Sequence, residues 1–478
     1  MSRLTVGFDL DMTLIDSRPG ISRVWEALAA ETGADIDVAA AVSRLGPPLD
    51  HELALWFPSG EVESMGERFR ALYPDHAVLP TVALPGAAEA LAAVRGHGGR
   101  SVVVTAKFEP NARLHIEHLG LDADEVVGWL WGAAKAEALI EHGASVYVGD
   151  HFYDVVGAKA AGAVSVAVAT GPCSAADLEA AGADVVLSDL TAFPQWLDEH
   201  LLAVRLGALE TQLRSLGGLM VAFSGGADSA FLLAAAVRAL GADHVVAATA
   251  ISDSLASQEL RPAADFARRL GVRHLTPHTH EMDRAGYRAN DGDRCYFCKA
   301  ELLDVLVPLA AEHDIAHIAT GTNADDAIAG FRPGIRAAVE RGAVTPLRDA
   351  DLTKAQVREA SRRWGLPTWD KPAAACLSSR VAYGITITPH RLGRIDRAEA
   401  GLRRALAAAG IPVTNLRVRD LGDRARVEVD GHLRDRVADH PPALDAVKDA
   451  GFATVEVDRR GFRSGSMNEL LPQPGRFR

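Results

Sequence analysis

Short β-branched segments alternate with helical stretches along most of this chain, and the alternation occurs in two separate series. The strand-like segments of the first series are LTVGFDLD (residues 4–11), RSVVVTA (100–106) and SVYVGD (145–150). Those of the second series are LMVAFSGG (219–226), HVVAATAI (244–251) and HIATGTN (317–323). Strands that alternate with helices form parallel sheets with helices on both faces. The sequence therefore predicts an α/β protein with two doubly wound parallel-sheet domains.

Two further regions differ from this pattern. Residues 193–218 have helical periodicity and no strand, so we expect a helical connector over 201–216 between the two series. After Ile385, a helical segment precedes RVRDLGDRARVEVD (417–430), which has the pattern of a hairpin around Leu421-Gly422-Asp423, and a second helix and the strand-like ATVEVD follow. The predicted domains are 1–200, 217–384 and a small C-terminal α+β domain at 385–478.

The composition is that of a globular protein that works in water. Hydrophobic residues make up 48% and charged residues 24% of the 478 residues. We find neither an apolar run of about 18 residues nor a signal-peptide pattern, and we expect a cytoplasmic protein without membrane association. The net charge is −17 over residues 1–200 and +4 over residues 201–478, so neither part has the basic balance of a dedicated nucleic-acid binder.

The segment FDLDMTLIDS places two aspartates at the end of the first predicted strand. Asp9 and Asp11 are two residues apart, so both carboxylates face the same side of a strand and can share a Mg²⁺ ion. One carboxylate can attack phosphorus while the other transfers protons. An isolated pair of this kind also occurs at solvated strand ends, so the choice depends on further residues.

Further residues occur in the order found in the haloacid dehalogenase (HAD) phosphohydrolases, which residues 1–200 resemble. They are Thr105 after VVV, Lys135 in GAAKAEAL, and Asp150 and Asp154 in GDHFYD. The resemblance implies a Rossmann-like fold with a helical cap over about residues 18–80. The implied roles are nucleophile for Asp9, acid/base for Asp11, phosphate and charge stabilisation for Thr105 and Lys135, and Mg²⁺ binding for Asp9, Asp11, Asp150 and Asp154.

Met12 departs from the family pattern, because HAD members usually have glycine after the second aspartate. We expect its bulky side chain to crowd the phosphate site. A domain that binds without turnover, or that serves oligomerisation, is therefore the alternative to a phosphatase.

The segment LMVAFSGGADSAFLLAAAVRALG combines an apolar strand, a glycine-rich turn and an amphipathic helix. Backbone N–H groups at the start of such a helix form an anion cradle, and the G-K-[ST] ending of the Walker type is missing. SGGADS resembles the PP-loop of ATP pyrophosphatases, and GTNADD resembles a second nucleotide segment of that superfamily, which implies an adenine-nucleotide hydrolase-like fold. The implied ATP-binding residues are Ser224, Gly225, Gly226, Asp228, Ser229, Gly321 and Asn323, and the implied Mg²⁺ ligands are Asp325 and Asp326. An ordinary glycine-rich turn is the alternative.

The four cysteines are too few for a disulfide framework. Cys295 and Cys298 have a C-x-x-C spacing in RCYFCK, at the start of a predicted helix, and Cys376 lies far downstream in KPAAACLSSR. Three thiolates are one short of filling a [4Fe-4S] cluster, which leaves one iron open to sulfide or substrate. Structural zinc and unligated thiols are the alternatives. Cys173 has no evident role.

From Leu209 to its end, the chain resembles the LarE family of ATP-dependent sulfur transferases, which build the nickel-pincer nucleotide cofactor. The resemblance rests on SGGADS, TKAQVREASRRWGLPTWDKP, the cysteine loop, LRVRDLGDRARVEV and the closing GFRSGSMNE. It implies that a carboxylate of pyridinium-3,5-biscarboxylic acid mononucleotide is adenylylated with ATP and then converted to a thiocarboxylate.

The resemblance also implies where the sulfur comes from. In one branch of the family, the cysteine that matches Cys376 gives up its own sulfur and becomes dehydroalanine, so each protein works once. In a second branch, three cysteines hold a [4Fe-4S] cluster that carries a transferable sulfide. Cys295, Cys298 and Cys376 match the second branch.

Arginines near the cysteine loop are suited to a substrate with carboxylates and a phosphate. Arg380, Arg417 and Arg419 carry planar guanidinium groups that bind such anions in a bidentate manner. For Arg417 and Arg419, which alternate on a strand, a solvated face is the alternative. Glu399 is either a metal ligand near the site or an exposed helical residue.

Together these observations predict a bifunctional enzyme, an HAD-like phosphatase fused to a LarE-type sulfur transferase that uses ATP, Mg²⁺ and a [4Fe-4S] cluster. The expected partners are the mononucleotide substrate and other enzymes of nickel-pincer cofactor synthesis, and we expect a homo-oligomer without nucleic acid. A [4Fe-4S]-dependent tRNA or nucleotide thiolase is the alternative function.

Overall fold

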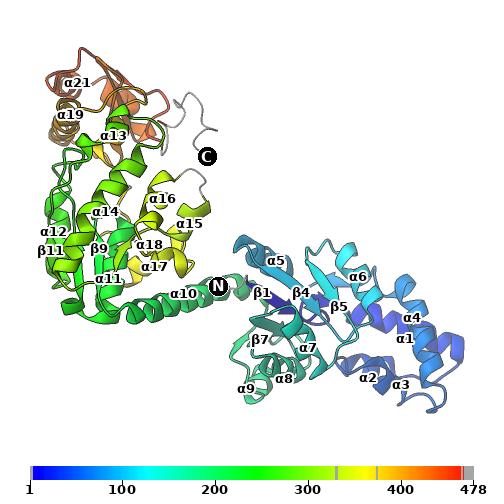
Figure 1. Ribbon diagram of the computed structural model, residues 1–478. Coiled ribbons are helices and arrows are strands. Elements are labelled where there is room, and N and C mark those ends of the chain that lie inside the picture. The colour runs from blue at the N-terminus through cyan, green and yellow to red at the C-terminus, as the bar shows by residue number, and fades with distance from the viewer. Residues whose placement is uncertain (1–3, 329–331, 373–374, 464–466, 468–478) are drawn as a thin grey trace. The chain divides into compact units, whose positions relative to one another are not determined.

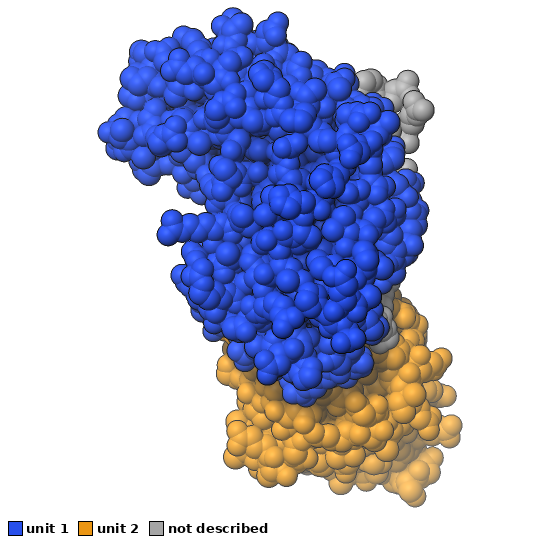
Figure 2. Space-filling model, turned by 60° about the vertical axis from the view of Figure 1, so that its left-hand side comes forward, with its two compact units in different colours: residues 1, 202–478 blue, residues 2–201 orange. Residues whose placement is uncertain are grey.

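The computed structural model describes residues 4–328, 332–372, 375–463 and 467. It divides into two compact units, which we call the N-terminal unit (Ser2–Leu201) and the C-terminal unit (Leu202–Arg478) (Figure 2). Most of the closing GFRSGSMNE motif lies outside the described residues. Among the helices described, none has the length and apolar character needed to cross a membrane.

The N-terminal unit contains a six-stranded parallel sheet in the order β5-β4-β1-β6-β7-β8. Alternate residues of its strands face opposite cores: Val103 of β4 packs on one face, and Val102 and Val104 pack on the other. This two-sided burial is why the strands are almost uniformly apolar. The strands are β1 (Thr5–Phe8), β4 (Arg100–Val104), β5 (Glu125–Val127), β6 (Val146–Gly149), β7 (Val164–Val168) and β8 (Val185–Leu187). The helices around it are α5 (Ala87–Gly96), α6 (Glu109–His118), α7 (Ala134–Glu141), α8 (Phe152–Ala161) and α9 (Ala175–Ala180) (Figure 1).

A helical insertion follows the first strand and has a core of its own. Trp25, Leu28, Phe69 and Tyr73 pack together in it. An antiparallel pair, β2 (Ile15–Asp16) and β3 (Val82–Ala83), joins the insertion to the rest of the unit. Its helices are α1 (Arg18–Thr32), α2 (Val38–Ser43), α3 (Leu49–Leu53) and α4 (Val62–His76), which Figure 1 shows gathered to one side of the sheet.

A single helix, α10 (Phe193–Leu216), contributes to both units. Phe193 and Leu197 pack in the core of the N-terminal unit, and Leu209 and Leu213 pack in the core of the C-terminal unit. The segment predicted as a connector therefore begins earlier as a helix and supplies core residues on both sides.

The C-terminal unit contains a four-stranded parallel sheet in the order β11-β10-β9-β12. Leu219 and Val221 of β9 face one core, and Met220 and Ala222 face the other. The strands are β9 (Leu219–Ala222), β10 (Val245–Ala248), β11 (Arg273–Leu275) and β12 (Ile318–Thr320). The helices are α11 (Ala227–Leu240), α12 (Leu260–Arg269), α13 (Ala285–Ala289), α14 (Arg294–Glu312), α15 (Ala324–Ile328), α16 (Pro333–Glu340), α17 (Pro346–Asp349) and α18 (Lys354–Arg363).

The last part of this unit is an α+β layer around a three-stranded sheet, β13-β14-β15. The predicted hairpin is confirmed, because β13 and β14 pair antiparallel, and β15 adds a parallel edge. The cysteine loop packs on this layer: Leu377 and Val381 lie in its core, and Val381 forms a bridge with Asp420. The elements are β13 (Leu416–Asp420), β14 (Arg424–Val429), β15 (Thr454–Val457), α19 (Pro389–Ala408), α20 (Arg434–Ala438) and α21 (Pro441–Lys448).

Candidate functional site

Carboxylates converge at one edge of the N-terminal sheet. Asp9 follows β1 and Asp150 follows β6, and the carboxyl ends of parallel neighbours meet at the same edge. Oxygen atoms of Asp9, Asp150 and Asp154 all lie within 4.8 Å of one another, and all three residues are buried. The structure therefore brings together three of the four Mg²⁺ ligands predicted for the N-terminal unit.

Lys135, on α7, is the cation inside this group. Its Nζ lies 3.0 Å from Oδ1 of Asp9 and 2.6 Å from Oδ1 of Asp154, and it donates to the Tyr147 hydroxyl at 2.9 Å. Burial raises the pKa of Asp9 to about 7, although Lys135 opposes this shift. Burial and the charges of Asp154 and Asp9 also raise the pKa of Asp150 well above its usual value. Three carboxylates thus share one ammonium group.

These residues fit a divalent cation. Oδ1 of Asp9 is buried and accepts no hydrogen bond from the described residues, despite its ion pair with Lys135. Carboxylate oxygens are the ligands that Mg²⁺ prefers, and its charge would offset the excess of negative charge. Glycines allow the close approach of the ligands, because a Cβ at Gly149 would collide with the Asp154 carboxyl and one at Gly171 with the Asp150 carboxyl.

Asp11 lies outside this group of three and pairs with a different cation, Lys107. The sequence analysis did not identify Lys107. Lys107 Nζ lies 2.9 Å from Oδ1 of Asp11, and Ser17 donates to the same oxygen. Burial favours the neutral acid, but Lys107 and Ser17 leave the pKa of Asp11 below its usual value. Lys107 follows Thr105 by two residues, and its N–H donates to Thr105 Oγ1 at 3.2 Å. Its position two residues after Thr105 is the sequence feature that could have identified Lys107 as a site residue.

The helical insertion also contributes to the site. Tyr73, on α4, accepts a hydrogen bond from Lys107 through its hydroxyl, which is also 2.9 Å from Nε2 of the buried His115. Burial, together with the charge of Lys107, lowers the pKa of His115 to about 4, so its imidazole is neutral at pH 7. Asp11 is therefore linked to the insertion through Lys107 and Tyr73.

Met12 has a left-handed backbone, with a φ of 59°. This conformation is easy for glycine and costly for other residues, which gives a physical reason why glycine suits the position. The Met12 side chain is buried, and its carbonyl oxygen accepts a hydrogen bond from Thr170.

The two predicted nucleotide motifs of the C-terminal unit are in contact. Gly225 takes a φ of +69° in the turn between β9 and α11, and the Ser224 and Ser229 hydroxyls are 3.1 Å apart across it. Gly321, after β12, lies so close that a Cβ there would be 2.8 Å from the Ser229 nitrogen. SGGADS and GTNADD therefore form one surface at the edge of the sheet.

The acidic residues of these motifs already have partners. Asn323 Nδ2 donates to Asp228 at 3.3 Å, and Asp326 and Asn323 exchange backbone-to-side-chain hydrogen bonds of 3.2 Å. Lys354, which sequence reasoning missed, pairs with Asp228 at 2.7 Å through Nζ, and its backbone N–H donates to Asp325 at 2.7 Å. The start of α18 thus orders both motifs.

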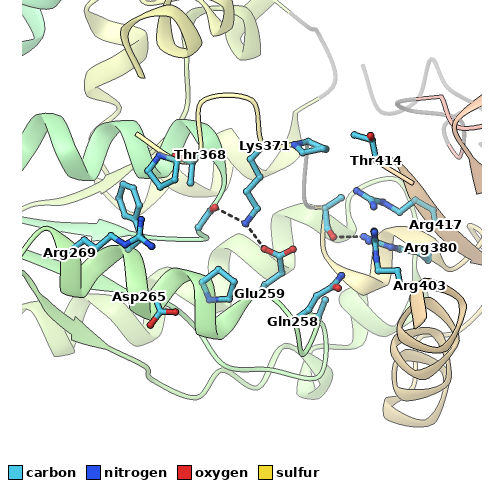
Figure 3. Close-up of a pocket in the computed structure, with 17 residues that line it drawn as sticks. Gln258, Glu259, Asp265, Arg269, Thr368, Lys371, Arg380, Arg403, Thr414 and Arg417 are labelled. Carbon is cyan, nitrogen blue, oxygen red and sulfur yellow. Dashed lines mark hydrogen bonds and ion pairs between the residues drawn. The ribbon is translucent and has the colours of Figure 1, made fainter. Parts of the chain in front are cut away.

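A cavity of about 490 Å³ extends from the glycine-rich turn to the cysteine loop (Figure 3). At one end, Lys371 Nζ donates to the Gly225 carbonyl at 2.9 Å and pairs with Glu259 at 2.7 Å. Figure 3 shows three arginines together at the other end. Among the residues that line the cavity are Gly225, Lys371, Ala375, Arg380, Arg403 and Arg417.

The two cysteine segments lie close together. Cys295 is exposed at the start of α14, and Cys298 and Cys376 are half-buried. Burial raises the pKa of the Cys298 thiol, and negative charge on Cys376 raises it further. Within the described residues, the three sulfurs do not approach one another as closely as the three aspartates do. A single zinc ion, with Zn–S distances of about 2.3 Å, would need its thiolates closer together than this.

Asn290 and Arg294 hold the cysteine loop against the C-x-x-C helix. Asn290 Nδ2 donates to the carbonyls of Ala382 and Ile385 at 2.8 and 2.9 Å. Arg294 donates to the Asn290 side chain and to the Ser378 carbonyl at 2.9 Å. No sequence pattern predicts this clamp, because the loop carbonyls are about 90 residues from Asn290.

The arginines predicted to bind substrate are buried. Arg380 pairs with Glu399 at 3.0 Å, and it also donates to the Cys376 carbonyl at 2.8 Å. Arg419 pairs with Glu428 at 2.7 Å. Burial, and then the charge of Arg380, lower the pKa of Arg417 to about 10, so it stays charged at pH 7. The solvated-face alternative for Arg417 and Arg419 is therefore wrong, as is an exposed position for Glu399.

Comparison with known proteins accounts for both units. The family model of haloacid dehalogenase-like hydrolases matches residues 6–159, and a HAD-hydrolase-like model matches residues 128–193. The phosphoglycolate phosphatase of Rhodospirillum rubrum is 31% identical, over 40% of this chain and 89% of its own length. The N-terminal unit thus has the HAD-like α/β fold with a parallel sheet.

Two further relatives cover the rest. The uncharacterised protein slr1717 of Synechocystis sp. is 39% identical over 57% of this chain and 99% of its own length. Pyridinium-3,5-bisthiocarboxylic acid mononucleotide synthase of Lactiplantibacillus plantarum is 32% identical over 56% of this chain and 96% of its own length. The chain belongs to the family of this synthase. A member of the synthase family is here joined to a HAD-like domain.

Proposed function

We propose that the C-terminal unit is an ATP-dependent sulfur transferase that converts a carboxylate of pyridinium-3,5-biscarboxylic acid mononucleotide to a thiocarboxylate. The observation that carries this proposal is the cavity of about 490 Å³, which Gly225 of the glycine-rich turn and Ala375 of the cysteine loop both line. A nucleotide bound at the turn can therefore meet a substrate beside Cys376. The kinship with the synthase supports the choice of substrate.

The first step is adenylylation. The turn before α11 offers backbone N–H groups to the ATP phosphates, and Lys371 and Lys354 place positive charge beside it. A substrate carboxylate oxygen attacks the α-phosphorus, the bond to pyrophosphate breaks, and pyrophosphate leaves. Arg403 and Arg417 at the far end of the cavity suit the remaining carboxylate and the phosphate of the substrate.

The second step transfers sulfur. A sulfide attacks the carbonyl carbon of the acyl adenylate, the bond from that carbon to the AMP oxygen breaks, and AMP leaves with the oxygen of the original carboxylate. Cys295, Cys298 and Cys376 are the residues that would hold a [4Fe-4S] cluster, which when bound supplies the sulfide. Arg380 holds the Cys376 carbonyl and thereby positions the loop.

Anaerobic purification with iron and sulfide analysis tests the source of the sulfur. We expect iron and sulfide in the wild-type protein, their loss in Cys298→Ser, and an intact Cys376 peptide by mass spectrometry after turnover. Cys173→Ser is the matched control and should keep the iron. Dehydroalanine at position 376 without bound iron would show instead that Cys376 gives up its own sulfur.

We propose a second activity, Mg²⁺-dependent phosphomonoester hydrolysis, for the N-terminal unit. Asp9 attacks phosphorus, the ester bond breaks, and the leaving oxygen takes a proton from solvent; Asp11, which Lys107 keeps ionised, then takes a proton from the water that releases phosphate from Asp9. Lys135 and Thr105 stabilise the charge, and Asp9, Asp150 and Asp154 would hold the ion, which supplies further charge neutralisation. Phosphate release by the full chain, with Asp9→Asn as the comparison, tests this activity. Equal release by both proteins would overturn it.

A further inference from the structure

Aromatic side chains gather next to the carboxylates of the N-terminal unit. They come from the loops after β4, β5 and β6 and from the start of α8, and we call them the aromatic rim: Phe108, Trp129, Trp131, His151 and Tyr153. The rings of Phe108 and Trp129 are 5.2 Å apart, those of Trp131 and Tyr153 are 4.7 Å apart, and those of His151 and Tyr153 are stacked at 5.4 Å.

Part of this rim faces solvent. Trp129 is 64% exposed and Tyr153 is 37% exposed, and their neighbour Phe152 is 40% exposed. Large exposed aromatic side chains that lie together mark binding sites more often than isolated ones do. The aromatic rim is therefore a candidate binding surface.

Trp129 is also held in a costly conformation. Its φ is +61°, which is rare for a bulky residue. The backbone is fixed on both sides: the Trp129 N–H donates to the Lys107 carbonyl at 2.9 Å, and the Leu130 N–H donates to the Thr105 carbonyl at 3.0 Å. Strain of this kind persists where the surroundings enforce it, and it is concentrated at functional sites.

The rim is interleaved with the residues of the candidate phosphate site. His151 and Tyr153 lie between Asp150 and Asp154 in the sequence, and Trp129 is hydrogen-bonded to the backbone of Lys107, whose side chain pairs with Asp11. A group bound to phosphate at Asp9 would extend past these rings.

The helical insertion bounds the same space. A Cβ at Gly46, in the loop before α3, would lie 3.3 Å from the His151 ring and 3.8 Å from the Trp131 ring. The Arg70 guanidinium of α4 lies 5.7 Å from the centre of the Trp129 ring. With the insertion on one side, the rim suits a small molecule.

We propose that the N-terminal unit selects phosphate monoesters whose alcohol part carries a planar aromatic ring, as a mononucleotide does. The inference deepens the proposed phosphohydrolase function and rests on it. The phosphate would lie at Asp9, and the ring would stack on Trp129 or Trp131. Stacking on aromatic side chains is favourable for every base, and a cationic ring gains a further attraction to the face of tryptophan.

Hydrolysis by the full chain with Mg²⁺ tests this selection. The probes are adenosine 5′-monophosphate and nicotinamide mononucleotide, with 2-phosphoglycolate as the phosphate ester without a ring. We expect Trp129→Ala to lower kcat/KM for the mononucleotides about tenfold or more, mainly through KM, and to lower it less than threefold for 2-phosphoglycolate. Trp129→Phe should recover most of the loss. Leu55→Ala, which removes an exposed apolar side chain of the insertion, is the control.

Trp129→Gly is a second variant that removes the ring and should fold, because glycine adopts a φ of +61° without strain. A loss that is equal for all three esters, or a wild-type preference for 2-phosphoglycolate, would overturn the ring selection and leave the phosphohydrolase standing. If no ester is hydrolysed, the phosphohydrolase proposal fails. In that case, quenching of tryptophan fluorescence by the mononucleotides tests whether the aromatic rim binds their rings. Quenching that is abolished by Trp129→Ala supports ring binding, and quenching that is absent or unchanged by Trp129→Ala overturns it.

Discussion

The two candidate sites bury charge in different ways. In the N-terminal unit, Asp9, Asp150 and Asp154 face one another around the single ammonium of Lys135. In the C-terminal unit, two buried arginines near the cysteine loop pair with buried carboxylates, Arg380 with Glu399 and Arg419 with Glu428. The first arrangement leaves negative charge for a ligand to offset. The second uses its buried charges to hold a loop.

This difference separates binding residues from positioning residues. A buried group that faces like charges is ready for an ion, whereas a buried group with an opposite partner gains little from a ligand. By this criterion Arg380 is a positioning residue, although its chemistry alone would suit a substrate carboxylate. Arg403, which lines the cavity and whose Nε is buried without a hydrogen-bond partner among the described residues, is a better binding residue.

The largest expected effects test whether the two sites are independent. Asp9→Asn should lower phosphate release about a thousandfold or more and leave sulfur transfer unchanged, because it removes only one nucleophile. Cys376→Ser should abolish sulfur transfer and leave phosphate release unchanged. Both activities are measured on the full chain, with Cys173→Ser as the control. A variant that loses both activities would contradict the separation.

The next effect concerns the buried pair at the cysteine loop. Glu399→Gln should lower the free energy of unfolding of the C-terminal unit by about 3 to 5 kcal/mol, because it leaves the Arg380 charge without its partner. The double variant Arg380→Met/Glu399→Leu should recover most of this loss, as measured by urea unfolding. If Glu399→Gln is as stable as the wild type, the pair does not hold the loop.

At the N-terminal site, we expect the removal of a buried charge to stabilise the protein. Asp150→Asn should raise the free energy of unfolding by about 1 to 2 kcal/mol in EDTA at pH 8, because it removes a buried carboxylate beside two others. The amide oxygen can still accept from the Thr13 hydroxyl, which donates to Asp150 at 3.0 Å. Thermal unfolding with and without Mg²⁺ measures this effect. Destabilisation in EDTA would contradict the repulsion between carboxylates.

The smallest effect on stability is expected at Arg403. Arg403→Gln should change the free energy of unfolding by less than about 1 kcal/mol, because no described partner of its Nε is lost. It should nevertheless raise KM for the mononucleotide substrate about tenfold, because a bidentate anion contact is removed. Arg397→Gln, on the same helix, is the control. A fall in stability with unchanged KM would make Arg403 a structural residue.

The sequence predicted the residues that a parallel sheet brings together by its topology. Asp9, Thr105 and Asp150 each follow a strand, so their meeting at one edge depends only on the parallel order of those strands. Tyr73 depends on how the insertion packs, which the local pattern does not contain. Strands β5, β8 and β11 are three residues long, which is too short for a periodic signal.

The arginines show a second limit. The residue type predicted the chemistry of Arg380 and Arg419 but not the choice between a substrate anion and an internal one. Glu399 is 19 residues from Arg380 and on another element, and only the folded chain places it 3.0 Å away. The residue type therefore predicted that these arginines bind an anion, and the packing of the chain decides that the anion is an internal carboxylate.

The clamp at Asn290 restricts which residue can occupy that position. The backbone there is left-handed, with a φ of 57°, and the side chain is completely buried. Its amide must donate to the loop and accept from Arg294. Aspartate could not donate, and glycine would fit the backbone and lose every side-chain bond. Because one side chain makes these bonds, a replacement at Asn290 would release the chain at Ala382 and at Ile385 together from the start of the C-x-x-C helix.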